Sequence, residues 1–176
     1  MKTIKEYILE AVHDKNMLSR AKNEDEPFVK AALEAEGWDI KEGTYDEDFK
    51  HIDLKASKGF EDEEGTKSIS NVTIDVKRNS PKNAHTTNYS IQTVDNKGKN
   101  FNYVENGYFA FINDDNKTIS LVKQLDIKDL ASTKQERETV KNGIKDGSKY
   151  VLLPKKEVHK LGRIIDPSAK IKNILK

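Results

Sequence analysis

The chain has 176 residues and a mass of 20.0 kDa, a length typical of one domain. Charged side chains make up 35% of it, while Leu, Ile, Val and Phe together account for 42 of the 176 residues. This apolar content exceeds the roughly 20% below which chains tend to stay disordered, so we expect a folded domain with a modest core. The absence of cysteine excludes disulfides, thiolate zinc sites and a cysteine nucleophile.

Targeting and membrane signals are also absent from the sequence. No apolar run approaches the 18 or so residues of a membrane span, and residues 1–6 lack the apolar stretch of a signal peptide. We therefore expect a soluble, cytoplasmic protein with no membrane partner.

The net charge of +1 conceals an uneven distribution. Residues 39–64 include ten acidic and four basic side chains, residues 76–100 five basic and one acidic, and residues 155–176 seven basic and two acidic. A nucleic-acid-binding protein needs a basic face rather than a basic composition. Such blocks also arise by chance in a chain this rich in charge, and the acidic block would repel DNA unless it binds cations or points away.

Apolar residues at helical spacing predict a helix at the N-terminus. A second helix is expected to begin near the acidic run before Pro27 and to end at Gly37. A strand should then open at 38–40, and the acidic residues at 45–48 predict a turn.

Two later segments, 50–56 and 72–77, alternate apolar and polar residues, as half-buried strands do. Asp53 lies on the polar face of the first strand, and Asp75 and Lys77 share the polar face of the second. The acidic, glycine-containing stretch between the strands, 57–68, predicts a long hairpin loop.

The rest of the chain continues the mixture of helices and strands. Residues 79–87 indicate a loop, and 89–94 are ambiguous between a short helix and a strand. Further expected elements are strands at 108–112, 118–122 and 150–153, helices at 125–130 and 134–144, and a helix from Pro154 through Leu161. This order predicts an α/β domain.

Signatures of the common nucleotide-binding and hydrolytic sites are missing. The sequence has no phosphate-binding loop with a lysine, no glycine-rich dinucleotide fingerprint, no His-Glu-x-x-His zinc motif and no Gly-x-Ser-x-Gly elbow.

The informative residues are two aspartates and a lysine on adjacent strands. If the two alternating strands pair as a hairpin, Asp53 and Asp75 come close enough to share a cation, which would relieve the repulsion between them. Hard oxygen ligands suit Mg²⁺ or Mn²⁺, and a neighbouring Lys77 can orient a water and stabilise charge on a phosphate. An exposed cross-strand Asp–Lys pair is the ordinary structural explanation of the same pattern.

Two short stretches resemble the two motifs of the PD-(D/E)xK nuclease superfamily: Ile52-Asp53 and Ile74-Asp75-Val76-Lys77. In the first, Ile stands in place of the usual Pro. The resemblance covers roughly residues 26–111. It implies a restriction-endonuclease-like core, a central mixed β-sheet flanked by helices, in the order helix, three strands, helix, strand. Archaeal Holliday-junction resolvases of this superfamily add a glutamate on the first helix, to which Glu26 corresponds, with Glu24 and Glu34 as rivals.

The resemblance also implies roles for these residues. Glu26, Asp53, Asp75 and the backbone carbonyl of Val76 would bind Mg²⁺ (or Mn²⁺), and Lys77 would orient the attacking water. The implied activity is endonucleolytic hydrolysis of DNA phosphodiester bonds by a protein that can act as a homodimer; RNA is not excluded as a substrate. A negative side chain that compensates the helix dipole is the structural alternative for Glu26.

Nucleic-acid contacts are expected after the second motif, at Lys82, His85 and Asn88 on a loop and at Gln92 beyond it. An ordinary solvated loop explains the same residues.

We therefore expect an N-terminal helix over 1–22, a nuclease-like core over 23–132 and a helical, basic extension over 133–176 packed on the same domain. The alternative functions are a non-catalytic nucleic-acid-binding or assembly protein with the same fold, and a protein-interaction module.

Overall fold

A six-stranded mixed sheet forms the centre of the computed structural model, which describes residues 20–44, 51–79, 86–114, 117–141 and 143–167. The expected N-terminal helix, the turn at 45–48 and the end of the basic tail lie outside these residues. The strands of the sheet follow the spatial order β1 (Asp39–Glu42), β2 (Leu54–Glu61), β3 (Lys67–Lys77), β5 (Gly107–Asn113), β6 (Thr118–Lys123) and β9 (Arg163–Ile165). The protein is thus an α/β protein, as predicted.

The first three strands form an antiparallel meander, and β5 then pairs with β3 in parallel. Parallel strands need a crossover connection, and here the crossover passes through a second sheet. That sheet has three antiparallel strands, in the order β4 (Asn88–Val94), β8 (Ile144–Pro154) and β7 (Arg137–Lys141). The segment that is ambiguous in the sequence, 89–94, is therefore a strand.

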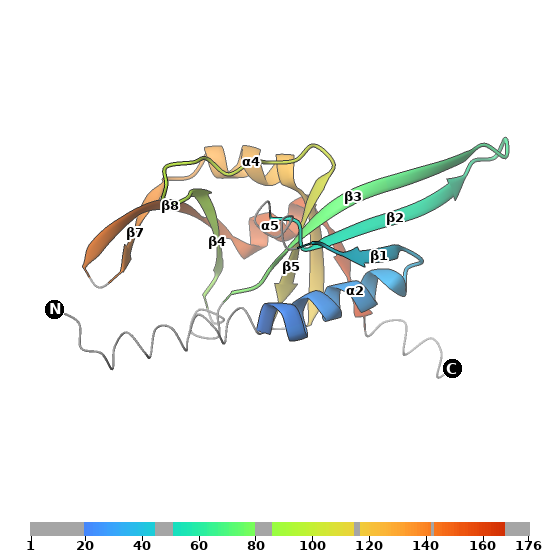
Figure 1. Cartoon of the computed structure of the whole chain (residues 1–176), viewed down its shortest axis with the longest axis horizontal. Helices are drawn as coiled ribbons and strands as arrows, with labels where there is room; N and C mark the ends of the chain where they lie inside the picture. Colours follow the sequence, from blue (N-terminus) through green and yellow to red (C-terminus); the bar gives the residue numbers. More distant parts are fainter. Residues whose placement is uncertain (1–19, 45–50, 80–85, 115–116, 142, 168–176) are drawn as a thin grey trace.

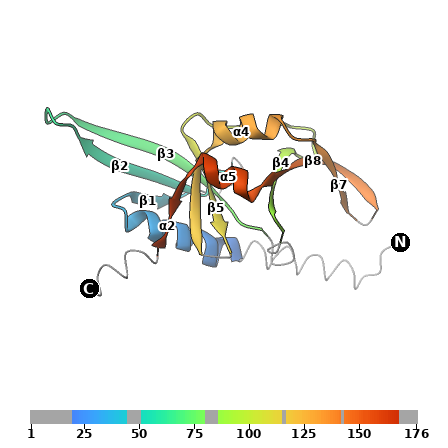
Figure 2. The same ribbon diagram turned by 180° about the vertical axis from the view of Figure 1, so that it is seen from behind.

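Among the described residues, three α-helices cover the faces of the central sheet: α2 (Glu26–Glu34), α4 (Gln124–Ser132) and α5 (Lys155–Leu161). Figure 1 shows α2 on one side of the sheet and α4 on the other, and Figure 2 shows α5 on the same side as α4. Within the described residues, no helix combines the length and the apolar character needed to cross a membrane.

Helix α2 continues a π-helical turn at Ala21–Asp25, so the helix starts earlier than the acidic run alone suggests. Pro27 has no N–H, and its ring would clash with the carbonyl four residues earlier in a regular helix. The wider turn, closed by the Glu26 N–H and the Ala21 carbonyl, accommodates the ring. Gly37 ends the helix with a φ of +83°, as expected.

The alternation of side chains on the central strands creates two cores. One core packs α2 against β1, β2, β3, β5, β6 and β9, with Leu33, Leu54 and Ile74 among its fully buried members. The other packs α4, α5 and the second sheet against the opposite face of β5 and β6, around Phe109 and Phe111. Strand β3 contributes to the first core through Ile74, which leaves its polar residues on the side of the second.

A polar chain crosses the second core and joins its layers. His159 on α5 lies 2.8 Å from the Ser120 hydroxyl on β6 through Nδ1 and 3.2 Å from the Tyr89 hydroxyl on β4 through Nε2. Burial, followed by the charge of Lys155, lowers the pKa of His159. The neutral imidazole therefore serves as a structural link between the central sheet, α5 and the second sheet.

The expected loop at 57–68 is wrong, because most of it is strand. Strands β2 and β3 stay paired as far as Glu61 and Lys67, and only a tight turn connects them. The Asp62 carboxylate accepts hydrogen bonds from two backbone N–H groups of this turn. The strands form a ribbon that projects from the sheet (Figure 1), so both faces meet solvent and the sequence carries no apolar alternation there.

The expected helix at 134–144 is also wrong, and much of the described part of the extension over 133–176, expected to be helical, is strand. This region contains the β7–β8 hairpin, with Gly143 at a φ of +78°, and β9, which completes one edge of the central sheet. Among the described residues of this region, α5 forms where the sequence predicts a helix after Pro154. Residues 134–141 are mostly Lys, Arg, Glu and Gln, and their helical propensity is overridden because β7 pairs with β8.

An ion-pair network joins the start of α2 to the ends of β3 and β5. Arg78 donates to Asp25 at 2.7 Å and to Asp114 at 2.7 Å, and its side chain is 19% exposed. Arg20 approaches the same Asp25 carboxylate at 3.4 Å. The network aligns α2 with the carboxyl ends of the two parallel strands.

Replacing Arg78 by alanine should lower the free energy of unfolding by about 2–3 kcal/mol, because it leaves the buried Asp25 carboxylate with the more distant Arg20 alone. Arg163→Ala is the matched control: its pair with Glu36 leaves the arginine 53% exposed, so the loss should be about 1 kcal/mol or less. Urea denaturation of both variants measures the difference. Equal losses would contradict the role given to the network.

Candidate functional site

The start of the β2–β3 pair brings two carboxylates together. Leu54 pairs with Ile74, so one step beyond them Asp53 comes opposite Asp75. The Asp53 N–H donates to the Ile74 carbonyl at 3.0 Å, and the Val76 N–H donates to Asp53 Oδ2 at 2.7 Å. The hairpin pairing on which the sequence prediction depends is therefore present, and the Asp53 side chain is fixed by the backbone of β3.

Asp75 is the most constrained member of the pair. Asp75 is only 2% exposed, and its Oδ1 forms an ion pair with Lys77 Nζ at 2.7 Å. Its Oδ2 is buried and has no hydrogen-bond partner among the described residues. A buried acceptor without a hydrogen-bond partner is uncommon in folded proteins and calls for an explanation, of which a catalytic role or a bound ion is one.

Burial is the largest cause that raises the pKa of Asp75, and the neighbouring Asp53 carboxylate adds to it. The charge of Lys77 acts in the opposite direction, and the balance places the pKa of Asp75 at about 7. Ionisation of Asp75 is therefore unfavourable in the folded protein, and a bound cation would stabilise the ionised carboxylate.

Lys77 is held on two sides. Besides its ion pair with Asp75, its ammonium lies 5.8 Å from the centre of the Phe109 ring, on the strand next to β3. The side chain is 28% exposed, so the ammonium stays at the boundary between the core and solvent.

A close backbone contact positions the segment that leads into β2. The Gly43 N–H donates to the Asp53 carbonyl at 2.7 Å, and an added Cβ at Gly43 would collide with the carbonyl oxygen of Ile52. Only glycine therefore allows β1 to approach this segment so closely. Any larger residue would displace Asp53.

His51 is a site residue that the sequence prediction missed. It adopts a φ of +58°, a conformation uncommon for residues other than glycine, and its Nδ1 lies 3.9 Å from Asp75 Oδ2. Burial, followed by the charge of Lys77, lowers the pKa of His51, while Asp53 opposes this shift. No motif contains His51, and its one signal in the sequence is that it shares the polar face of Asp53.

Glu26 does not join Asp53 and Asp75 in a metal-ligating group. Its helix, α2, covers the face of the sheet opposite to the one on which Asp75 lies. Glu26 is 5% exposed, and Lys22 lies 3.2 Å from its carboxylate. In the part of the chain that the structure describes, no group of three or more His, Cys, Asp or Glu side chains is arranged to hold a metal ion.

The two aspartates nevertheless fit a hard divalent cation. The unpartnered Asp75 Oδ2 and the opposing Asp53 carboxylate supply oxygen ligands on one side, and Mg²⁺ commonly completes its shell with waters and substrate phosphate. The role of the Val76 carbonyl as a further ligand stays a prediction.

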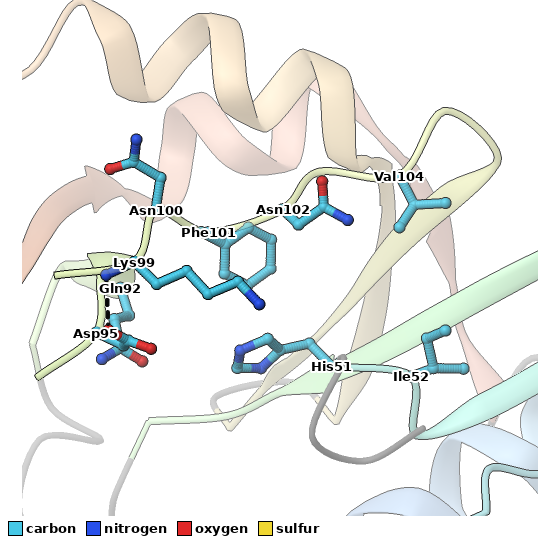
Figure 3. A pocket seen from close by; sticks show the side chains of 9 residues that line it. All are labelled: His51, Ile52, Gln92, Asp95, Lys99, Asn100, Phe101, Asn102 and Val104. Atoms are coloured by element: carbon cyan, nitrogen blue, oxygen red, sulfur yellow. Dashed lines mark hydrogen bonds between the residues drawn. The ribbon is translucent and has the colours of Figure 1, made fainter. Parts of the chain in front are cut away.

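The residues predicted to contact nucleic acid are only partly described. Lys82 and His85 lie outside the described residues. Asn88 and Gln92 are both on β4, on its outward side, and line a polar groove together with Ser90 and Tyr150. Gln92 also lines a separate cavity next to His51 (Figure 3).

No protein-family model, curated protein or solved structure matches this chain. The resemblance to a nuclease superfamily therefore stays a prediction, and the function has to be inferred from the chemistry of the site.

The raised pKa of Asp75 makes the stability of the metal-free protein depend on pH. An ordinary Asp pKa of about 3.9 describes the unfolded chain, so folding favours the protonated carboxyl. This contribution is fully present below pH 4 and is lost as pH rises through about 7. Between pH 5 and pH 8 in EDTA, the wild type should lose about 2 kcal/mol of stability relative to Asp75→Asn, as measured by urea denaturation.

Asp129→Asn is the control for this measurement, because Asp129 is an exposed residue on α4 and its variant should follow the wild type. If the stability of the wild type and of Asp75→Asn changed with pH in the same way, Asp75 would ionise as readily in the folded as in the unfolded chain. That result would contradict the raised pKa of Asp75.

Proposed function

We propose that this protein is a metal-dependent phosphodiesterase that cleaves DNA, of the PD-(D/E)xK type. The observation that carries the proposal is the almost fully buried Asp75 carboxylate, which faces Asp53 across a strand pair. One of its oxygens pairs with Lys77, and the other accepts no hydrogen bond from the described residues. An exposed cross-strand Asp–Lys pair, the structural alternative, would not be buried in this way.

The topology supports the same proposal. A helix is followed by a three-stranded meander and then by a strand parallel to the third, with Asp53 at the start of the second strand and Asp75 and Lys77 on the third. This is the order that the resemblance predicts, with one departure. The crossover between β3 and β5 contains strand β4 where a helix is expected.

The residues divide the chemical tasks between them. Mg²⁺ or Mn²⁺ bound by Asp53 and Asp75 would neutralise charge on the scissile phosphate and acidify a water. Lys77, fixed by Asp75 and the Phe109 ring, holds an ammonium at the edge of the site, where it can orient a water and stabilise a phosphate oxygen. The water oxygen forms a bond to phosphorus as the bond to the 3′ oxygen breaks. The 3′ oxygen takes one proton of that water, which leaves a 3′-hydroxyl and a 5′-phosphate.

The polar groove on β4 offers a path for the strand to be cut. Asn88, Ser90 and Gln92 project from alternate positions on the outward face of the second sheet, and Gln92 also lines the cavity that His51 lines. Amide and hydroxyl groups of this kind contact phosphates and bases of both DNA and RNA. RNA therefore belongs in the test as a second substrate.

A second function, non-catalytic binding of nucleic acid, is favoured by one observation. The described residues provide two carboxylates but no third metal-ligating side chain beside them. In this second function the Asp75–Lys77 ion pair would only stabilise the fold, and the protein would bind nucleic acid without cleaving it.

Cleavage of supercoiled plasmid with Mg²⁺, Mn²⁺ or EDTA tests the proposal. We expect cutting that requires metal and falls by about 100-fold or more in Asp75→Asn and in Lys77→Ala, since each removes a group that stabilises charge in the transition state. Asp129→Asn should retain full activity.

Two results would point away from a nuclease. Full activity of Asp75→Asn would locate any cutting elsewhere. The second result is that the protein binds plasmid and RNA without cleaving either in any metal, with the same affinity in Asp75→Asn. That result would favour the non-catalytic function.

A further inference from the structure

A cavity of about 300 Å³ lies beside the two aspartates, between the start of β2 and the segment that joins β4 to β5. Its volume is at the lower end of the range for small-ligand pockets, about 300–1,000 Å³. Figure 3 shows the segment that leads to β5 on one side and His51 on the other. The residues that matter for its chemistry are His51, Gln92, Lys99, Asn100, Phe101 and Asn102.

The wall formed by this segment is fixed by its own hydrogen bonds. Asp95 Oδ1 accepts from the N–H groups of Lys97 and Lys99 at 2.8 Å each, which closes a tight turn after β4. Beyond the turn, the chain pairs back on β4 through a bridge between Val94 and Asn100. The cavity wall is therefore a preformed hairpin rather than an open loop.

Three residues of the hairpin that carry amide groups line this cavity: Gln92, Asn100 and Asn102. Within the described residues, no hydrogen bond joins their amide groups to other side chains or to the main chain. Each amide offers a donor and an acceptor, the combination that reads the polar edge of a nucleobase. Lys99 adds a positive charge at the same opening, suited to a phosphate.

Aromatic surface completes the pocket. The His51 ring lies against the Phe101 ring with their centres 4.8 Å apart, and the His51 side chain is still 43% exposed. Phe101 in turn packs on Tyr103 and Phe109, which fixes its position. A base can stack on the exposed imidazole, since aromatic rings and bases stack favourably by about 1–3 kcal/mol.

The same histidine links the cavity to the candidate active site, because its Nδ1 is 3.9 Å from Asp75 Oδ2. A nucleotide in the cavity would therefore be one unit away from a phosphate at Asp53 and Asp75. A base can enter such a pocket only when it is unpaired, because the pocket contacts the edge that pairing occupies.

We propose that this cavity binds one unpaired nucleotide next to the phosphate at Asp53 and Asp75, so that the protein acts on single-stranded or frayed DNA rather than on fully paired duplex. The proposal rests on the proposed function in one respect, namely that the neighbouring phosphate lies at Asp53 and Asp75. The cavity itself is tested by binding, without any cleavage.

The experiment measures the affinity of the full chain for two fluorescein-labelled DNA hairpins in EDTA by fluorescence anisotropy. One hairpin has a fully paired end, and the other carries a short unpaired extension. We expect the extended hairpin to bind about tenfold more tightly, and the double variant Asn100→Ala/Asn102→Ala to lose that preference while its affinity for the paired hairpin is unchanged. Asn96→Ala, in the same turn but outside the cavity, is the matched control.

Equal affinity of the wild type for the two hairpins, or a preference that survives in the double variant, would overturn the proposal. The double variant must unfold at the wild-type urea concentration; if it does not, the single variant Asn102→Ala is measured in its place. Cleavage of both hairpins with Mg²⁺ is measured in parallel. A binding preference without cleavage would uphold the cavity and refute the proposed hydrolysis, whereas cleavage without a preference would do the reverse.

Discussion

The burial of Asp75 in the middle of a sheet is the constraint on which the rest of the site depends. Strand β3 is paired on both sides, antiparallel to β2 and parallel to β5, and its apolar residues fill the core under α2. Alternation then forces Asp75 and Lys77 onto the opposite face, beside Phe109. Lys77 stabilises the carboxylate there, whereas burial and the backbone-anchored Asp53 raise its pKa.

The crossover between β3 and β5 contributes to both the second core and the cavity beside the site. A chain that leaves β3 must travel to the second sheet and return to run parallel to β3. The return segment carries the hairpin turn and Phe101, so the same connection that builds the second core also encloses the cavity beside His51. Folding and the geometry of the site are thus linked through one stretch of chain rather than through separate insertions.

Local patterns in the sequence predict the parts of the structure whose residues alternate against a core. The strand of Asp75 and Lys77, its pairing with the strand after Asp53, and the start of α5 at Pro154 follow from such patterns. The sequence wrongly predicts a loop for the outer part of the β2–β3 ribbon and a helix for β7, because both project into solvent and carry charged residues without apolar alternation. The expected strand at 150–153 is part of β8. His51 and the cavity arise from the tertiary path of the crossover, which no short motif encodes.

The central claim is that Asp53 and Asp75 act as a pair on one divalent cation. Calorimetric titration of Mn²⁺ into the wild type, Asp53→Asn, Asp75→Asn and Glu26→Gln at pH 8 tests it most directly. The account predicts one site in the wild type, lost in both aspartate variants and retained in Glu26→Gln, whose helix covers the other face of the sheet. Equal Mn²⁺ affinity in the wild type and in both aspartate variants would contradict the claim.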